Sequence, residues 1–291
     1  MPAGFAIATG NFDGLHLGHC KILSALAAEA KALRLTPLVL SYEPHTRHFL
    51  VKPGDPPLLC TLDQKKQMIQ NLGLQAEALP FDRNIAGLDG VAYVREVIIG
   101  RYGAKVWVFG PNHRFGVGGK GDLTQVQAQF PDLRIVRVDP LEMGGEPISS
   151  SRIRNLLAAG EVALAAELLG RPYALRGVVV HGEARGRTIG FPTANLQIPP
   201  YQMMPGFGVY AGWVNFEGES HKAVVNIGMR PTFQALSPTI EIHLPGWSGD
   251  LYGKTMEMKL NLKLRGELHF ASIQDLKMQI ACDVQRALSM I

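Results

Sequence analysis

The sequence predicts two domains of different fold class: an α/β domain, then an antiparallel β domain that ends in a helix. The chain has 291 residues, which suits two domains at roughly 150 residues each. Its first part alternates short apolar strands with helical segments, whereas its last part contains a strict two-residue alternation. A helical run ends at Gly170, just before Pro172, so we expect domains at 1–170 and 171–291.

The first domain is predicted as a parallel sheet with helices on both faces. Strand and helix patterns follow one another, which is typical of a doubly wound sheet. Ligands bind such sheets beyond the carboxyl ends of the strands, so the loops after Thr9, Tyr42 and Phe109 are candidate binding loops. The expected strands are 5–9, 38–42, 105–109 and 134–138, and the expected helices are 18–35, 62–72 and 90–102.

The second domain is predicted as a small antiparallel barrel or sandwich. Residues 255–265 alternate apolar and polar side chains, so one strand face is buried and the other is wet. Ser272 and Asp275 resemble a capping box that opens a final helix. Other expected strands are 175–180, 209–216, 222–226 and 239–244, and the final helix carries an apolar stripe of Ile273, Leu276, Ile280, Val284 and Leu288.

Charge and cysteine content narrow the function. There are 29 Lys and Arg against 25 Asp and Glu, a net charge of +4, which is too low to indicate a nucleic-acid partner. The three cysteines are far apart and odd in number, which favours a reducing compartment over a disulfide framework. The start lacks a signal-peptide pattern, and no apolar run approaches the roughly 18 residues of a membrane span. We therefore expect a cytoplasmic protein that binds small phosphorylated ligands.

The segment 10–19, GNFDGLHLGH, lies between a predicted strand and a predicted helix. A helix N-terminus presents free N–H groups to an anion, and Gly18 permits its close approach. His16 and His19 can donate to phosphate oxygens and stabilise charge that grows during attack. The alternative is a capped turn in which the histidines bond the backbone, which we would favour for a lone histidine.

Two further segments of the first domain carry polar side chains suited to phosphate. Residues 148–154, ISSSRIR, precede a helical stretch; its serines can cap the helix or bind phosphate, and Arg154 could clamp a triphosphate. Residues 109–121, FGPNHRFGVGGKG, form a glycine-rich loop, for which a flexible surface loop is an equal alternative.

Together these segments resemble the adenylyltransferase module of bifunctional riboflavin kinase/FAD synthetases, a Rossmann-like HxGH nucleotidyltransferase. The resemblance implies that His16 and His19 are catalytic and contact ATP phosphates. It places Ser150, Ser151 and Arg154 on the other side of the triphosphate. The FMN phosphate is already a nucleophile, so the protein's part is positioning and charge neutralisation. The loop residues implied at the nucleotide are Gly10, Asn11, Phe12, Asp13, Gly14 and Gly18.

The chain departs from that family at two places. It has Asn112-His113 where the family usually has Asp-Phe, and Pro44-His45-Thr46 where the family usually has Pro-His-Pro. Both segments are expected to border the flavin and nucleotide pocket, with His45, Asn112 and Arg114 as pocket candidates. The departures leave open a kinase whose adenylyltransferase module is weakened or inactive.

In the second domain, residues 182–195 read GEARGRTIGFPTAN. Two glycine-spaced arginines suit a nucleotide phosphate loop. Thr193 and Asn195 offer neutral oxygens that Mg²⁺ accepts when phosphates complete its coordination. The alternative is a proline turn whose asparagine bonds its own backbone.

Glu241 stands between Ile240 and Ile242 in a predicted strand, so its side chain points to the opposite face. A carboxylate on the open side of a strand could deprotonate a hydroxyl that attacks ATP. The alternative is a solvated strand face.

These segments resemble the riboflavin kinase domain, a small barrel. The resemblance implies Mg²⁺ at Thr193 and Asn195, and Glu241 as catalytic base. The predicted reactions are riboflavin plus ATP to FMN and ADP, then FMN plus ATP to FAD and pyrophosphate. No nucleic-acid or membrane partner is expected, and the oligomeric state is left open. The residues implied at ATP in the kinase are Gly182, Arg185, Gly186, Arg187, Gly190, Phe191, Pro192, Thr193 and Asn195.

Two other functions remain as alternatives to the bifunctional enzyme and the single kinase. A flavin- or nucleotide-binding regulator without turnover is disfavoured because Glu241, Thr193 and Asn195 are all present. A relative of aminoacyl-tRNA synthetases would share His-x-Gly-His, but the chain has no Lys-Met-Ser-Lys loop and a low net charge.

Overall fold

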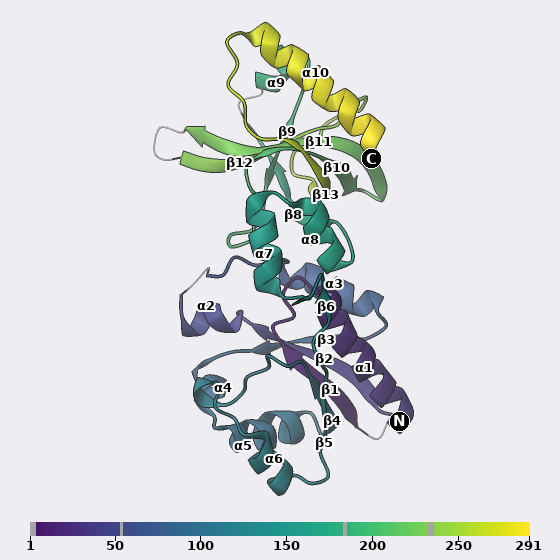
Figure 1. The fold of residues 1–291 in the computed structure, drawn as a ribbon, viewed down its shortest axis with the longest axis vertical. Coiled ribbons are helices and arrows are strands. Elements are labelled where there is room, and N and C mark those ends of the chain that lie inside the picture. Colours follow the sequence, from purple (N-terminus) through teal and green to yellow (C-terminus); the bar gives the residue numbers. More distant parts are fainter. Residues whose placement is uncertain (1–3, 53–54, 183–184, 232–235) are drawn as a thin grey trace. The chain divides into compact units, whose positions relative to one another are not determined.

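The computed structural model describes residues 4–52, 55–182, 185–231 and 236–291. It divides into two compact units, Met1–Ser150 and Ser151–Ile291 (Figure 1). This division falls after the first residue of α7 (Ser150–Ala159) and before α8 (Val162–Leu169), whereas the sequence places the boundary after both helices. The domain boundary at 170/171 stays a prediction.

The first unit contains a five-stranded sheet whose strand pairs are all parallel, as predicted. The order reverses between the central strand β1 and its neighbour β4, which makes a topological switch point at their carboxyl ends. The strand β3 was not predicted, because alanine and glutamate give Gln-Ala-Glu-Ala-Leu-Pro a weak strand signal. In sheet order the strands are β3 (Gln75–Pro80), β2 (Thr36–Glu43), β1 (Phe5–Gly10), β4 (Ala104–Phe109) and β5 (Arg134–Arg137).

Helices cover both faces of this sheet, as predicted. Alternate residues of β1 enter two separate cores: Ala6 and Ala8 pack against α1 (Leu17–Leu33) and α3 (Leu62–Asn71), and Ile7 faces the other core. The segment predicted as one helix over 90–102 is a short α-helix followed by a π-helix, with i→i+5 bonding. The remaining elements are α2 (Thr46–Leu50), α4 (Arg83–Gly87), α5 (Gly90–Tyr93), η1 (Val94–Arg101), η2 (Val117–Gly119), α6 (Leu123–Gln129), β6 (Glu142–Met143) and β7 (Glu146–Pro147).

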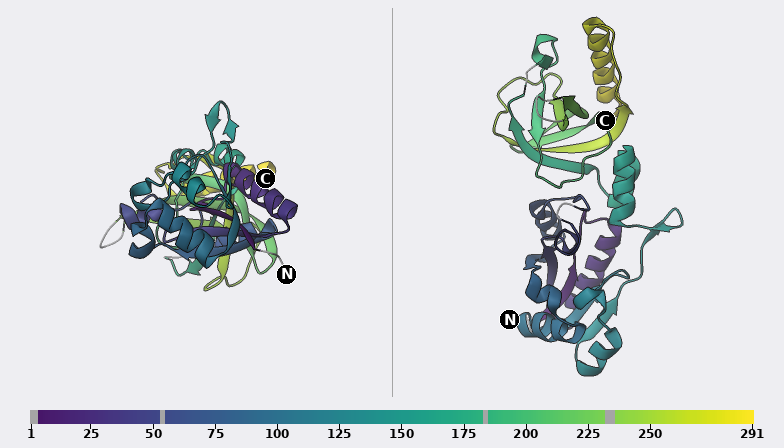
Figure 2. Two further views of the ribbon diagram at one scale, coloured as in Figure 1. Left: turned by 90° about the horizontal axis from the view of Figure 1, so that it is seen from below. Right: turned by 90° about the vertical axis from the view of Figure 1, so that its left-hand side faces the viewer.

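The second unit contains a closed six-stranded barrel with antiparallel pairing, so of the two predicted architectures the barrel is confirmed (Figure 2, right). The alternation in 255–265 works as predicted, since Met256, Met258 and Leu260 are fully buried. The strands are β8 (Tyr173–Val180), β9 (Ala194–Gln197), β10 (Gly208–Phe216), β11 (Glu219–Pro231), β12 (Leu236–His243) and β13 (Thr255–Arg265), and a short helix α9 (Arg185–Thr188) precedes β9.

The final helix α10 (Ile273–Met290) lies outside the barrel (Figure 2) and begins as predicted. The Ser272 hydroxyl accepts from the Asp275 N–H at 3.1 Å. The predicted apolar stripe is wrong at its ends, because Ile273 and Leu288 are 67% and 42% exposed. Asp283 is buried instead, because its carboxylate accepts from Arg265 Nε at 2.9 Å.

Among the described residues, no helix is both long enough and apolar enough to cross a bilayer.

Candidate active sites

The two histidines of the first unit lie side by side at the start of α1. The His16 ring caps the helix, with Nδ1 accepting from the His19 N–H at 3.3 Å. The two rings stack with centroids 3.7 Å apart and an interplanar angle of 15°. The capped turn is therefore present, and it places the two histidine rings side by side, while their contact with phosphate stays a prediction. His16 is buried, while His19 is half-buried and meets the Phe12 ring edge-on.

Asp13 and Gly14 build the loop that carries these histidines. The buried Asp13 carboxylate accepts from the Leu59 N–H at 2.9 Å, and the Gly14 N–H donates to Cys60 Sγ at 3.2 Å. Gly14 has φ +76°, and a Cβ there would stand 2.7 Å from the Leu59 side chain, so only glycine fits. Ser150 completes the support, since its hydroxyl donates to the Asp13 carbonyl at 3.0 Å. Leu59 and Cys60 were missed because no local pattern marks a contact 46 residues away.

Asn11 joins the loop after β1 to the loop after β2. Its Nδ2 donates to Thr46 Oγ1 at 2.9 Å, and its Oδ1 accepts from the Thr46 N–H at 3.1 Å. The proline that the family usually has here could make neither bond, because it lacks both the hydroxyl and the N–H. The neighbouring His45 caps α2 through Nδ1 and is only 9% exposed. The departure at Thr46 thus ties Asn11 in place.

The departure at Asn112-His113 also fits its surroundings. The His113 ring packs with Trp107 and Phe109, at centroid distances of 5.6 and 5.0 Å. Burial lowers its pKa to about 4. The neutral Nε2 lies 3.2 Å from the Thr9 hydroxyl, which can donate to it. His113 therefore takes the place of the phenylalanine that the family usually has here, as an uncharged aromatic ring.

Asn112 and Arg114, on either side of His113, are exposed in the loop that leaves β4. This loop lies next to the histidine loop, because β4 pairs with β1. Gly18, in the first turn of α1, sits against the His16 ring, from which a Cβ would be 3.1 Å away. Ser151 and Arg154 belong to the second unit, where they start α7.

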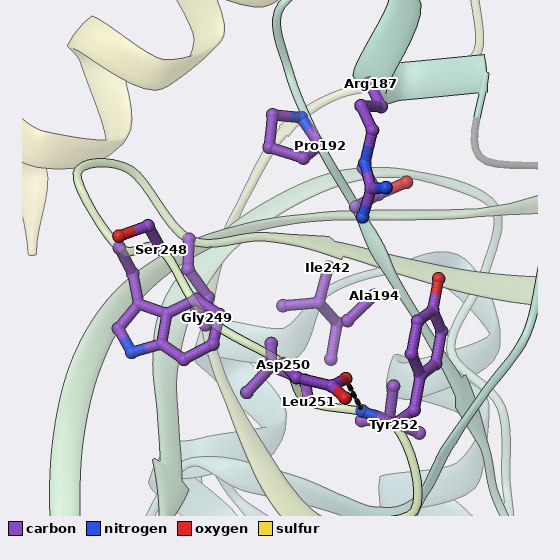
Figure 3. A pocket seen from close by; sticks show the side chains of 13 residues that line it. Arg187, Pro192, Ala194, Ile242, Ser248, Gly249, Asp250, Leu251 and Tyr252 are labelled. Carbon is purple, nitrogen blue, oxygen red and sulfur yellow. Dashed lines mark hydrogen bonds between the residues drawn. The ribbon is translucent and has the colours of Figure 1, made fainter.

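A cavity of about 510 Å³ opens in the second unit beside β9 and β12 (Figure 3). It contains three residues predicted at ATP, namely Arg187, Pro192 and Thr193. Figure 3 shows the Arg187 side chain extending toward the space above Ala194 and the Tyr252 ring. The remaining lining is mostly apolar or aromatic: Val179, Ala194, Ile242, Leu244, Trp247, Ser248, Gly249, Asp250, Leu251 and Tyr252.

The loop 247–252 forms one wall of this cavity; residues 249–254 belong to the segments that resemble the riboflavin kinase domain, whereas no sequence pattern marked Trp247. Trp247 lies against Gly249, where a Cβ would be 2.7 Å from the indole ring. The Asp250 carboxylate accepts from the Tyr252 N–H at 2.9 Å, and the Tyr252 ring stacks on His181 with centroids 3.8 Å apart. Aromatic walls with one cation suit a nucleotide, whose base is flat and whose phosphates are anionic.

Glu241 lies on the outer face of the barrel, as the alternation predicts, because Ile240 and Ile242 are buried. It pairs in register with Asn195 on β9 and with Asn226 on β11. Cross-strand partners point to the same side, so these three polar side chains form a row. Thr193 lines the cavity and lies two residues before Asn195, just ahead of β9.

Gly182 and the stretch 185–191 contact residues of this row and of its surroundings. A Cβ at Gly182 would stand 2.1 Å from Asn195 Nδ2, so the carboxamide rests directly on the glycine backbone. The Gly186 carbonyl accepts from the Phe191 N–H at 2.8 Å, and Gly190 turns the chain with φ +90°. Phe191 meets the His243 ring edge-on, and His243 Nδ1 lies 2.8 Å from the Pro192 carbonyl. The Arg185 side chain lies outside the described residues.

The residues present fit Mg²⁺ only as part of a shared site. Within the part of the chain that the structure describes, no group of three or more His, Cys, Asp or Glu side chains could hold a metal ion. Thr193 and Asn195 supply two neutral oxygens, so phosphate oxygens and water must supply the other ligands, as Mg²⁺ commonly requires.

Comparison with known proteins matches both halves of the chain. Residues 1–152 match the FAD synthetase family, and residues 169–291 match the riboflavin kinase family. The bifunctional riboflavin kinase/FMN adenylyltransferase of Escherichia coli K12 is 36% identical over 284 residues, covering 96% of this chain and 90% of the relative. The Bacillus subtilis enzyme of the same name is 35% identical over 288 residues, covering 97% and 91%.

A solved structure is similar over the whole length. The crystal structure of a macrolide-efflux protein from Streptococcus pneumoniae has a TM-score of 0.90 at 28% identity, and the match covers 99% of this chain and 95% of that one. Fold, sequence and the order of the two matched families agree. The chain therefore belongs to the bifunctional riboflavin kinase/FMN adenylyltransferase family, with the adenylyltransferase in its first half and the kinase in its second.

Proposed function

We propose that the cavity beside β9 and β12 binds the ATP that phosphorylates riboflavin. Trp247 and Tyr252 offer flat surfaces to the base, and Arg187 is a cation for the phosphates. Glu241 is the general base for the riboflavin hydroxyl, supported by its place in the outward row between Asn195 and Asn226. The observation that carries this proposal is that Arg187, Pro192 and Thr193 line one cavity, with Thr193 two residues before Asn195, the strand partner of Glu241.

Mg²⁺ would be held by Thr193 and Asn195 together with ATP oxygens. When bound, it would neutralise phosphate charge during transfer. The chain itself positions Asn195. The Gly182 backbone supports the Asn195 carboxamide, and the pairing of β9 with β12 places Asn195 opposite Glu241.

For FAD formation, we propose that His16 and His19 contact the ATP phosphates at the start of α1. Their stacked rings and the helix N-terminus lie at the switch point between β1 and β4. Ser150, Ser151 and Arg154 are proposed as further phosphate contacts, and His45, Asn112 and Arg114 as candidates around the flavin. His45 is already used as a helix cap, so of these three Asn112 and Arg114 are better placed to meet a ligand.

Riboflavin, FMN and ATP are the proposed substrates, with no nucleic-acid partner. A cytoplasmic location is proposed from the three free thiols, Cys20, Cys60 and Cys282, which suit a reducing compartment.

The test is one incubation with riboflavin, excess ATP and Mg²⁺, in which chromatography separates the flavins over time. FMN that rises and then gives way to FAD supports both sites. FMN that accumulates without FAD, even when FMN is supplied directly, would contradict the adenylyltransferase assignment. The fits of Thr46 and His113 favour the first outcome.

A further inference from the structure

Lys65 is a buried cation beneath the histidine loop. It lies in the first turn of α3, where Thr61 and Gln64 form a capping box that fixes the helix start. Its side chain is only 6% exposed, and its Nζ donates to the Ser41 hydroxyl at 2.8 Å. Among the described residues no carboxylate lies within ion-pair distance of this ammonium group.

Ser41 connects Lys65 to the loop after β1, which contains Asn11 and leads to His16 and His19. It is buried near the carboxyl end of β2, in register with Gly10 at the end of β1. Its hydroxyl donates to the Asn11 carbonyl at 3.2 Å. The positive charge is thus one hydroxyl group away from the loop that carries His16 and His19.

A packing role alone does not explain this lysine. An unpaired buried charge destabilises a fold, and apolar residues of similar volume commonly replace buried charges without loss of stability. Ser41 does not need the ammonium group either, because its own proton already goes to Asn11. Because the buried charge lowers the stability of the fold, we expect it to have a function, namely to attract an anion that is bound during the reaction.

We propose that Lys65 is a positioning residue for adenylyl transfer, which holds the Asn11 loop through Ser41 and supplies positive charge for the phosphates bound there. This inference rests on the proposed adenylyltransferase site. The field of one charge extends across the intervening hydroxyl, because screening inside a protein is much weaker than in water. Its effect should fall on phosphate binding and on turnover together.

The decisive variant is Lys65→Met, which keeps the length of the side chain and removes its charge. We expect the rate of FAD formation to fall on the order of tenfold or more. In the reverse reaction, FAD plus pyrophosphate to FMN and ATP, the KM for pyrophosphate should rise. The melting temperature should be unchanged or higher, because the variant removes a buried, unpaired charge.

Two controls separate this role from a structural one. Lys65→Arg keeps the charge and should recover part of the lost FAD formation. Riboflavin kinase activity, assayed on the same samples, should not change in either variant. Normal FAD formation by Lys65→Met would overturn the inference, as would a lowered melting temperature that arginine fails to rescue. A wild-type chain that makes FMN but no FAD would instead contradict the proposed adenylyltransferase site itself.

Discussion

The two units hold their candidate residues in different ways. In the first unit, loop side chains bear both the structure and the proposed chemistry: His16 caps α1, Asp13 anchors the 59–60 backbone, and Asn11 clamps Thr46. In the second unit, the barrel ladder holds the backbone, and Glu241 and Asn195 project from paired strands. A substitution in the loop therefore affects fold and chemistry together, whereas an outward strand residue can be changed with less damage to the fold.

The largest expected effect comes from the histidine pair. His16→Asn with His19→Ala should lower FAD formation about 10³-fold to 10⁴-fold, since two phosphate donors are lost. Asparagine at residue 16 keeps a helix-capping acceptor, so the fold should survive. Flavin chromatography with FMN as substrate measures the loss, and FMN formation from riboflavin is the internal control. Unchanged FAD formation would remove the phosphate-contact role.

Glu241→Gln makes the converse change. It keeps the shape of the side chain and removes the base, so riboflavin phosphorylation should fall about 10²-fold or more. FAD formation from supplied FMN should stay normal, because Glu241 lies in the barrel and is not among the residues proposed for adenylyl transfer. Near-normal kinase turnover in this variant would show that Glu241 is only a solvated strand residue.

A smaller effect is expected from Gly182→Ala. Its Cβ would overlap the Asn195 carboxamide and displace a proposed Mg²⁺ ligand. We expect kinase kcat/KM to fall roughly tenfold, which corresponds to a loss of about 1.4 kcal/mol of transition-state stabilisation. The Mg²⁺ concentration needed for half-maximal activity should rise. Gly87→Ala, which has nothing within 4 Å of its Cβ, is the control. Equal kinase rates at limiting Mg²⁺ would contradict the proposed support of Asn195.

His113 should make the stability of the first unit depend on pH. Its pKa is about 4 in the fold and 6.5 ordinarily, so the unfolded chain binds more protons between these values. The free energy of unfolding should therefore fall as the pH drops below 6.5, by about 2 kcal/mol at pH 5. Urea unfolding at pH 7.5 and pH 5 measures this difference. His113→Phe should abolish it, and an identical pH dependence in that variant would assign the effect to other groups.

The smallest effect concerns the end of the barrel unit. Ser272→Ala removes the cap of α10 and should lower the free energy of unfolding by about 1 kcal/mol. Ser272→Asp should restore most of it, since aspartate also caps. Urea unfolding of the three proteins is the measurement, and equal stabilities would show that the helix end frays without consequence.

Sequence periodicity predicted most of the fold, because burial follows the pattern directly. The strand 255–265 and the helix start at Ser272 are examples. It did not predict β9 (Ala194–Gln197), because the strand follows directly on the turn-like Phe-Pro-Thr and is only four residues long, and it forms by pairing with β8 and β12. The stripe on α10 was overestimated, because Arg265 brings Asp283 into the helix interface.

For the sites, the glycine and histidine motifs were visible because their spacing is local. Lys65, Cys60 and Trp247 were not, since each acquires its role from contacts distant in sequence. The pairing of Asn11 with Thr46 likewise needed the fold, which shows that a departure from a family pattern can be compensated locally.

Closure of the barrel determines where a change in the sequence disturbs the fold least. Every strand is held by two neighbours, so an insertion within a strand would disturb pairing on both sides. The loop 247–252 faces no such constraint, although it forms a wall of the cavity. Substitutions in this loop are therefore expected to change what the cavity binds with less damage to the barrel than changes at the strand neighbours of Glu241.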